Sequence, residues 1–328
     1  MNPPAPPLAH SITDVIGGTP MLELHQIRRR IGLEGRLLMK LEYFNPGGSK
    51  KDRIALEMIR EAKAQGLLRP GQTVIELTSG NTGTGLAIVC RAMGHPFITV
   101  MSRGNTPERA RMMQALGAQV VLVDQAAASV PNQVSGEDLA LVEQCAQRLT
   151  QEHAAFRADQ FHLEANVLAH ERHTGPEIWQ QSDGSVDVFV DFAGSGGTFT
   201  GVSRFLKGVH PAARCYLVEP ASTPALAGGP ITQPGHQIQG GGYSMTELPL
   251  LERKLVTDYL TVTDEQAIAS SRMLAEEEGI FAGFSAGAHL AAAIDLLQGK
   301  ERGATIAFLA CDTGLKYLST DLYPTKEG

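Results

Sequence analysis

Three polar, glycine-rich turns stand at points where the sequence predicts a helix to begin. The first, Asn45-Pro-Gly-Gly-Ser-Lys-Lys-Asp-Arg53, carries the adjacent lysines Lys50 and Lys51. The other two, residues 78–83 and 194–198, each follow an apolar, strand-like run. Such a turn directs free backbone N–H groups and the positive end of a helix at a ligand, so it suits an anion. One reactive amine and two such turns favour pyridoxal phosphate, a cofactor with an aldehyde and a phosphate.

The turn at residues 194–198 is the best candidate for the phosphate site. Its glycines would let the backbone approach the ligand, and its two hydroxyls would add donors; the residues are Gly194, Ser195, Gly196, Gly197 and Thr198. A dinucleotide site is the rival, because Glu219 ends the next strand where a ribose-binding acid would sit. Phe199 occupies the place of that motif's third glycine. We therefore favour the phosphate of a small cofactor, with a plain turn as the remaining alternative.

The turn at residues 78–83 predicts a carboxylate site. Hydroxyls, an amide and bare N–H groups converge there, from Thr78, Ser79, Gly80, Asn81 and Thr82. The structural alternative is a helix cap, since Ser, Thr and Asn are the best capping residues. A cap needs one such residue and this turn has four, so binding is favoured.

Several other polar residues have plain structural interpretations. A lysine pair at a helix start is normally solvated, and spacing alone gives Lys50 and Lys51 only a weak functional signal. The cluster His162, His170 and His173 lacks the spacing and the acids of a metal site, so no metal is predicted and surface or capping histidines are expected. After an apolar strand, Cys311 is expected to be a buried, inert thiol. On a predicted helix, His289 is expected to be structural.

Composition narrows the class of protein. The chain has 328 residues, of which 43% are hydrophobic and 19% charged, as in an ordinary globular enzyme of about two domains. A net charge of −7 argues against nucleic acid as a partner. The sequence contains no run of 18 apolar residues, so no membrane span is predicted. The four cysteines lie far apart without CxxC spacing, which fits a reducing cytoplasm, and the proline-rich residues 1–11 read as a flexible arm.

Apolar strand-like runs alternate with helical patterns, which predicts two α/β lobes with mostly parallel sheets covered by helices. Strands are expected at Leu37–Leu41, Thr73–Leu77, Phe97–Met101, Gln119–Val123, Val186–Phe192, Arg214–Val218 and Thr305–Leu309. Helices are expected near 51–65, 82–94, 106–117, 137–153, 198–208, 264–279 and 286–298. The glycine- and proline-rich stretch 220–255 is too long for a plain connector, so a functional loop is expected there.

Together these segments resemble the cysteine synthase (O-acetylserine sulfhydrylase) and cystathionine β-synthase family of fold-type-II pyridoxal phosphate enzymes. The resemblance covers nearly the whole chain. It includes the opening segment Ile16-Gly-Gly-Thr-Pro-Met-Leu22, the lysine turn, Gly-Phe-Ser285-Ala-Gly-Ala, and the closing segment Cys311-Asp-Thr-Gly-Leu-Lys-Tyr-Leu-Ser-Thr320.

The resemblance implies a role for each matched residue. Lys51, directly before Asp-Arg, would be the Schiff-base lysine, and Ser285 would bond the pyridine nitrogen of the cofactor. The phosphate loop would be residues 194–198, and Asn81 would contact the ring hydroxyl. The substrate carboxylate would lie at Thr78, Ser79, Gly80, Thr82 and Gln160. Residues 1–44 would be an arm and segment packing on the large domain, 45–160 a smaller, mobile domain carrying Lys51, and 161–328 the larger domain.

The implied activity is β-replacement on an L-serine derivative, through an aminoacrylate, with sulfide or another nucleophile. β-Elimination and the synthesis of cystathionine or another β-substituted alanine use the same machinery, and a regulatory homologue without turnover is a further alternative. The family usually forms homodimers. The chain departs from the family pattern at Gly240-Gly-Gly-Tyr-Ser-Met245, at Leu163-Glu164, at Cys311, and at Lys50, where the family has a small apolar residue.

Overall fold

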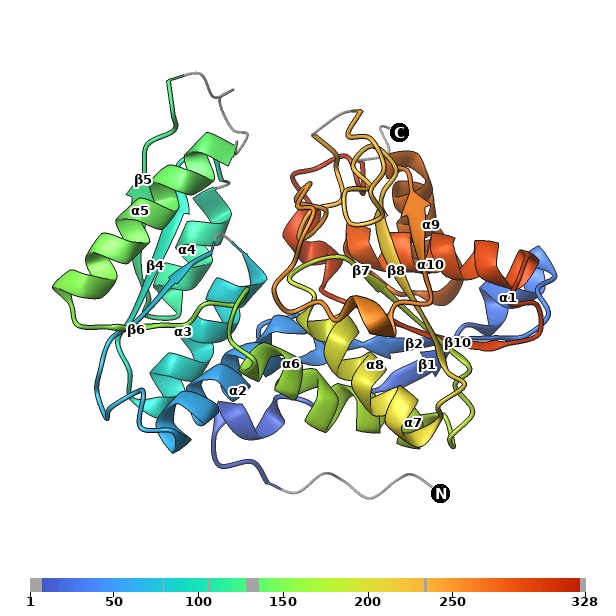
Figure 1. Ribbon diagram of the computed structural model, residues 1–328, viewed down its shortest axis with the longest axis horizontal. Coiled ribbons are helices and arrows are strands. Elements are labelled where there is room, and N and C mark those ends of the chain that lie inside the picture. Colours follow the sequence, from blue (N-terminus) through green and yellow to red (C-terminus); the bar gives the residue numbers. More distant parts are fainter. Residues whose placement is uncertain (1–7, 79, 106, 128–135, 233–234, 325–328) are drawn as a thin grey trace. The chain divides into compact units, whose positions relative to one another are not determined.

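The computed structural model describes residues 8–78, 80–105, 107–127, 136–232 and 235–324 (Figure 1). The chain divides into two compact units. Unit 1 comprises Met1–Gly18, Asn45–Gly47 and Lys51–Ala158, and unit 2 comprises Thr19–Phe44, Gly48–Lys50 and Asp159–Gly328. Among the described residues, no helix is both long and apolar enough to cross a membrane.

Unit 1 is built on a four-stranded parallel sheet in the order β5-β4-β3-β6. Helix α5 covers one face, where Val142 and Ala146 pack on Ile75, Ile98 and Val100. Helix α3 also packs on this sheet, and α2 packs against α3. The elements are η1(Ile12–Val15), α2(Lys51–Ala64), β3(Val74–Leu77), α3(Asn81–Met93), β4(Phe97–Ser102), α4(Pro107–Ala115), β5(Gln119–Val123), α5(Gly136–Glu152) and β6(Phe156–Arg157).

Unit 2 is built on a six-stranded sheet in the order β1-β2-β10-β7-β8-β9, in which only the β1–β2 pair is antiparallel. Its strands are β1(Met21–Glu23), β2(Arg36–Leu41), β7(Val188–Phe192), β8(Arg214–Pro220), β9(Asp258–Val262) and β10(Thr305–Ala310). Its helices are α1(His25–Ile31), η2(Glu42–Phe44), α6(Ala165–Ala169), a π-helical turn η3(His170–Thr174), α7(Gly175–Gln181), α8(Gly197–Val209), η4(Arg253–Leu255), α9(Asp264–Glu278), α10(Phe284–Gln298) and η5(Gly314–Tyr317).

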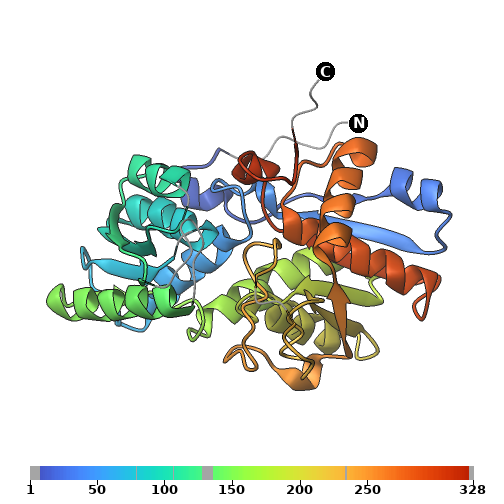
Figure 2. The same cartoon turned by 90° about the horizontal axis from the view of Figure 1, so that it is seen from above.

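Helices cover both faces of the unit 2 sheet because its central strands are apolar on both sides. Along β7, Val188 and Val190 belong to the hydrophobic core shared with α1, α9 and α10, whereas Phe189 belongs to the core shared with α7 and α8. In Figure 2 the orange and red helices α9 and α10 lie on one side of this sheet and the yellow-green helices α7 and α8 on the other. Burial on both faces holds the strands of this sheet in place. The loops at the carboxyl ends of parallel strands usually form binding sites, so these loops start from fixed positions.

The predicted fold class is confirmed: both units are α/β, with largely parallel sheets flanked by helices. Each of the seven expected strands and seven expected helices is present, with ends shifted by a few residues. No sequence pattern predicted α1, the helical segment 165–181, or the strands β1, β6 and β9. These elements are short, lie at sheet edges, or carry many polar residues, so their apolar periodicity is weak.

Candidate active site

The phosphate-type turn lies where the sequence predicted it, between the end of β7 and the start of α8 in unit 2. Gly196 has φ 85°, in the left-handed region that favours glycine, and it precedes the first turn of α8. The first N–H groups of a helix have no partner within the helix, so they are available to an anion. Ser195 and Thr198 are each only 5% exposed, which places their hydroxyls in a sheltered position.

A buried amide that the sequence analysis did not single out supports this turn. Asn166, in α6, donates from Nδ2 to the Gln160 carbonyl at 2.7 Å and to Ser195 Oγ at 2.9 Å. Its Oδ1 is buried and accepts no hydrogen bond within the described part of the chain. A Cβ at Gly197 would lie 2.2 Å from this oxygen, so only glycine fits there. The turn is thus a cradle whose shape depends on Asn166.

A second support comes from His170, which lies in the π-helical turn and is fully buried. Its Nδ1 is 2.9 Å from Thr174 Oγ1 and its Nε2 is 3.1 Å from Thr198 Oγ1. The expectation of a surface or capping histidine is therefore wrong for His170. It fails because the side chain faces the turn of α8, 28 residues further along the chain.

The dinucleotide alternative loses the acid on which it depended. The Glu219 carboxylate accepts hydrogen bonds from the backbone N–H groups of Leu226 and Ala227, at 2.8 and 2.9 Å. It is 3% exposed and fixes the start of the long loop after β8. From the other end of that loop, Arg253 donates to the carbonyls of Leu226 and Thr246. Both charged side chains are engaged in holding the loop.

The predicted carboxylate turn lies in unit 1, between β3 and α3. Thr78 Oγ1 accepts hydrogen bonds from the N–H groups of Gly83, at 3.1 Å, and Gly80, at 3.4 Å. The Thr78 hydroxyl therefore acts as a cap, the structural alternative, while Gly80, Asn81 and Thr82 form the start of the helix. Ser79 lies outside the described residues.

A cation that the sequence analysis overlooked lies beside this turn. The guanidinium of Arg109, in α4, is 3.8 Å from the position that a Cβ at Gly80 would occupy. A positive charge next to the bare N–H groups of a helix start strengthens a site for a carboxylate. No local pattern around Arg109 indicates a site, because a basic residue on a polar helix is common.

The proposed Schiff-base residue Lys51 is the first residue of α2, in unit 1. The turn before it is tight: Gly47 N–H donates to Asp52 Oδ2 at 2.5 Å, and a Cβ at Gly47 would lie 2.4 Å from Oδ1 of the same carboxylate. Asp52 thus ties the lysine turn to the helix start, where a negative charge is favourable. The remaining matched residues, Ser285 at the start of α10 and Gln160 after β6, belong to unit 2.

The neighbouring Lys50 is mostly buried and is paired, contrary to the expectation of a solvated lysine pair. Its side chain is 12% exposed, and Nζ lies 3.0 Å from Asp191 Oδ1. Burial opposes the charges of both groups, but their attraction prevails. The attraction raises the pKa of Lys50 and lowers the pKa of Asp191 to about 2.

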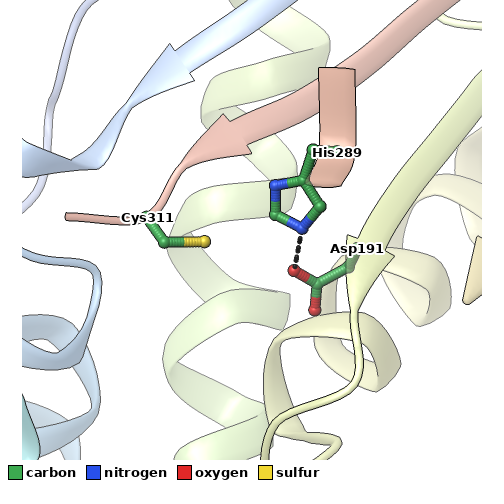
Figure 3. Close-up of side chains that lie close together, drawn as sticks. All are labelled: Asp191, His289 and Cys311. Carbon is green, nitrogen blue, oxygen red and sulfur yellow. Dashed lines mark ion pairs between the residues drawn. The ribbon is translucent and has the colours of Figure 1, made fainter. Parts of the chain in front are cut away.

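Asp191 also faces His289 and Cys311 (Figure 3). His289 is fully buried: Nδ1 donates to the Leu309 carbonyl at 2.7 Å, and Nε2 accepts from the Phe192 N–H at 2.7 Å and lies 3.4 Å from Asp191 Oδ1. Burial disfavours protonation, whereas Cys311 and Asp191 raise the pKa of His289. Protonation at Nε2 would cost the Phe192 hydrogen bond, which limits that rise.

Cys311 is buried, as expected, but its surroundings are charged. Burial by itself would raise the pKa of the thiol, yet Lys50 and His289 outweigh it and lower the pKa. The donor atoms of Asp191, His289 and Cys311 lie within 4.8 Å of one another, a spacing that a metal ion could bridge. However, both ring nitrogens of His289 are bonded to the backbone and Lys50 already neutralises Asp191. The cluster is therefore a closed set of ion pairs and hydrogen bonds.

These features define an α/β protein with a sheltered glycine turn at the start of α8 and a lysine at the start of α2. The sequence model of the family described as "Pyridoxal-phosphate dependent enzyme" matches residues 12–312. A cysteine synthase of Staphylococcus aureus is 39% identical over 316 residues, which cover 95% of this chain and 96% of that protein. The chain belongs to this family of pyridoxal-phosphate dependent enzymes, and its cofactor is pyridoxal phosphate.

Solved structures of similar enzymes support the same family. O-acetyl serine sulfhydrylase isoform 3 from Entamoeba histolytica superposes with a TM-score of 0.90 at 34% identity, covering 100% of this chain and 96% of that one. An O-ureido-L-serine synthase superposes with a TM-score of 0.88 at 37% identity, covering 98% of each chain. The resemblance drawn from the sequence is confirmed, and the sheltered hydroxyls of Ser195 and Thr198 beside the start of α8 fit the phosphate end of the cofactor.

Proposed function

We propose that this chain catalyses β-replacement on an O-acyl-L-serine, with sulfide or another small nucleophile as the incoming group. The observation that carries the proposal is the match over 95% of the chain to a cysteine synthase. Two similar structures also belong to enzymes whose names refer to serine derivatives. Lys51 and Ser285, which a catalytic member needs, are both present.

Bound pyridoxal phosphate supplies an aldehyde that links to amines and a ring that accepts electrons. In this proposal Lys51 would hold the cofactor through its aldehyde, and the Lys51 amine would serve as the base for the α-proton of the substrate. The cradle at 194–198 binds the phosphate. The hydroxyl of Ser285, at the start of α10, bonds the ring nitrogen as a neutral partner, which favours chemistry at the β-carbon. Asn81 contacts the ring hydroxyl.

The substrate carboxylate is assigned to the turn after β3, with Gln160 from unit 2. Support comes from the N–H groups at the start of α3, from the buried hydroxyl of Thr82, and from Arg109 beside Gly80. Thr78 shapes this turn through its caps to Gly80 and Gly83. An oriented carboxylate would place the α- and β-carbons of the substrate consistently for the lysine.

Borohydride reduction followed by peptide mass mapping tests the role of Lys51. We expect the cofactor mass on Lys51, and none on this peptide in a Lys51→Ala variant, which should also lose the visible cofactor absorbance. Cofactor mass on Lys50 instead, or unchanged absorbance in the variant, would refute the assignment.

A substrate screen tests the reaction itself. O-Acetylserine, O-phosphoserine, serine and cysteine are each mixed with the holoenzyme, with and without sulfide, and cysteine, sulfide and pyruvate are measured. We expect cysteine from O-acetylserine and sulfide. Pyruvate as the main product would favour β-elimination, and no turnover with any of them would favour a regulatory homologue.

Two further properties belong to the proposal. We expect a homodimer in the cytoplasm, in line with the family resemblance. Light scattering of the purified holoenzyme measures the assembly directly, and a mass of 35.1 kDa, that of a single chain, would contradict the dimer.

A further inference from the structure

Lys50, Asp191, His289 and Cys311 form a buried polar cluster in unit 2, called here the buried quartet (Figure 3 draws three of its members). The reaction proposed above assigns none of the four a role. Positions 50 and 311 are also places where the chain departs from the family pattern. A charged cluster in a protein interior is costly unless its members are paired, so its presence calls for a physical reason.

Each member of the buried quartet is close in sequence to a segment that the proposed function uses. Lys50 directly precedes Lys51, and Asp191 stands three residues before Gly194. His289 is one helical turn beyond Ser285 on α10. The cluster therefore joins the lysine turn, the strand that leads into the phosphate cradle, and the helix that carries the proposed ring partner.

The chain is anchored twice at Lys50. Its backbone N–H donates to the Cys311 carbonyl at 2.8 Å, and its side chain pairs with Asp191 at 3.0 Å. One residue earlier, Ser49 forms an isolated β-bridge with Asp312. The division between the two units falls directly after Lys50, so this is the last residue that unit 2 holds before α2 begins.

We propose that Lys50 is a positioning residue: its buried ion pair with Asp191 fixes the backbone that carries Lys51 and so sets how the Lys51 amine is presented to the cofactor. An apolar side chain at position 50 would fill the same space without a directional contact. An ion pair in a low-dielectric interior holds the residue at one distance from one partner. The inference rests on the proposed role of Lys51.

A double-mutant cycle on the holoenzyme tests the inference, with Lys50→Met, Asp191→Val and the two together. Each single variant leaves one buried charge unpaired, so we expect its denaturant midpoint to fall. The double variant removes both charges, so we expect a midpoint above either single variant. We also expect its visible circular dichroism to stay altered and kcat to stay reduced, by up to about 100-fold, with KM little changed, because Lys51 is no longer held in place.

A double variant with recovered stability and wild-type dichroism and kcat would overturn the inference, since the pair would then only fill space. A double variant no more stable than the single variants would overturn it too, because the two charges would not be coupled. Should a single variant fail to fold, the dichroism and kcat of the double variant against wild type decide alone.

Lys300→Met is the matched control. Lys300 pairs with Asp258 at 2.6 Å, but the two side chains are 47% and 55% exposed, so we expect no change in cofactor dichroism or kcat. Failure of the proposed function is recognised separately. Cofactor mass on a lysine other than Lys51 refutes the proposed function, whereas mass on Lys51 together with an unperturbed double variant refutes only the role of Lys50.

Discussion

The contact between Gly197 and Asn166 gives the sharpest prediction for the phosphate cradle. A Cβ at Gly197 would lie 2.2 Å from Asn166 Oδ1 and 2.5 Å from its Cγ. An ordinary contact begins near 3.4 Å, so the amide oxygen would have to move by about 1.2 Å. Because Asn166 is fully buried and packed, it has no open space into which to move.

The magnitude follows from what the displacement breaks. Asn166 Nδ2 would lose its hydrogen bonds to the Gln160 carbonyl and Ser195 Oγ, at about 1 kcal/mol each. Overpacking adds about 1–3 kcal/mol. Replacing a helical glycine with alanine returns about 0.5–1 kcal/mol. We therefore expect Gly197→Ala to lower the free energy of unfolding by about 2–4.5 kcal/mol, and to weaken pyridoxal phosphate binding because Ser195 loses its partner.

Urea unfolding of the cofactor-free protein measures the stability change, and a fluorescence titration with pyridoxal phosphate measures the affinity. Gly208→Ala is the matched control, because Gly208 is in the same helix and a Cβ there meets nothing within 4 Å. That variant should be more stable than wild type by about 0.5–1 kcal/mol, with unchanged cofactor affinity.

A second variant pair checks whether Gly197 and Asn166 are coupled. In an Asn166→Ala background the obstacle at position 197 is gone, so adding Gly197→Ala should cost less than about 0.5 kcal/mol further. If Gly197→Ala proves as stable as Gly208→Ala, or costs the same with and without Asn166, the clash is not what the cradle depends on.

Two further predictions follow from buried titratable groups. Burial alone would raise the pKa of Asp191, but Lys50 lowers this pKa to about 2, below the ordinary 3.8. The stability that the Asp191 carboxylate contributes is therefore present above about pH 4 and is lost as the pH falls toward 2. Unfolding measured against pH should show this loss in wild type and a smaller one in Asp191→Val; equal slopes would contradict it. Burial raises the pKa of Cys90 to about 12, so alkylation at mildly alkaline pH should label Cys90 only after denaturation, and peptide mapping of native protein checks this.

Much of the fold was predictable because its signals are local. Apolar runs such as Thr305–Ala310, buried at every position, and capping signals such as the Thr263–Gln266 box before α9 act within a few residues. The segment 165–181 was missed because its helices are short and interrupted by a π-helical turn with charged residues. The edge strand β9 was missed because only Val262 is buried.

Those parts of the candidate site that depend on local sequence were also predictable. The glycine turns at 78–83 and 194–198 gave a recognisable sequence signal, because the unpaired N–H groups of a helix start depend on local sequence alone. Asn166 and His170 did not, since their importance comes from Ser195 and Thr198, which lie 29 and 28 residues away in sequence. No pattern around Asn166 distinguishes it from any other helical asparagine.

The sequence by itself determined the alternation of strands and helices, the positions of the turns, and the family whose motifs the chain resembles. Only the tertiary structure decided which polar side chains are paired. It turned Lys50 from a solvated cation into the partner of Asp191, and it brought His289 and Cys311 to the same place. The physical reason is that desolvation and Coulomb attraction depend on distances in space, whereas periodicity and capping depend on distances along the chain.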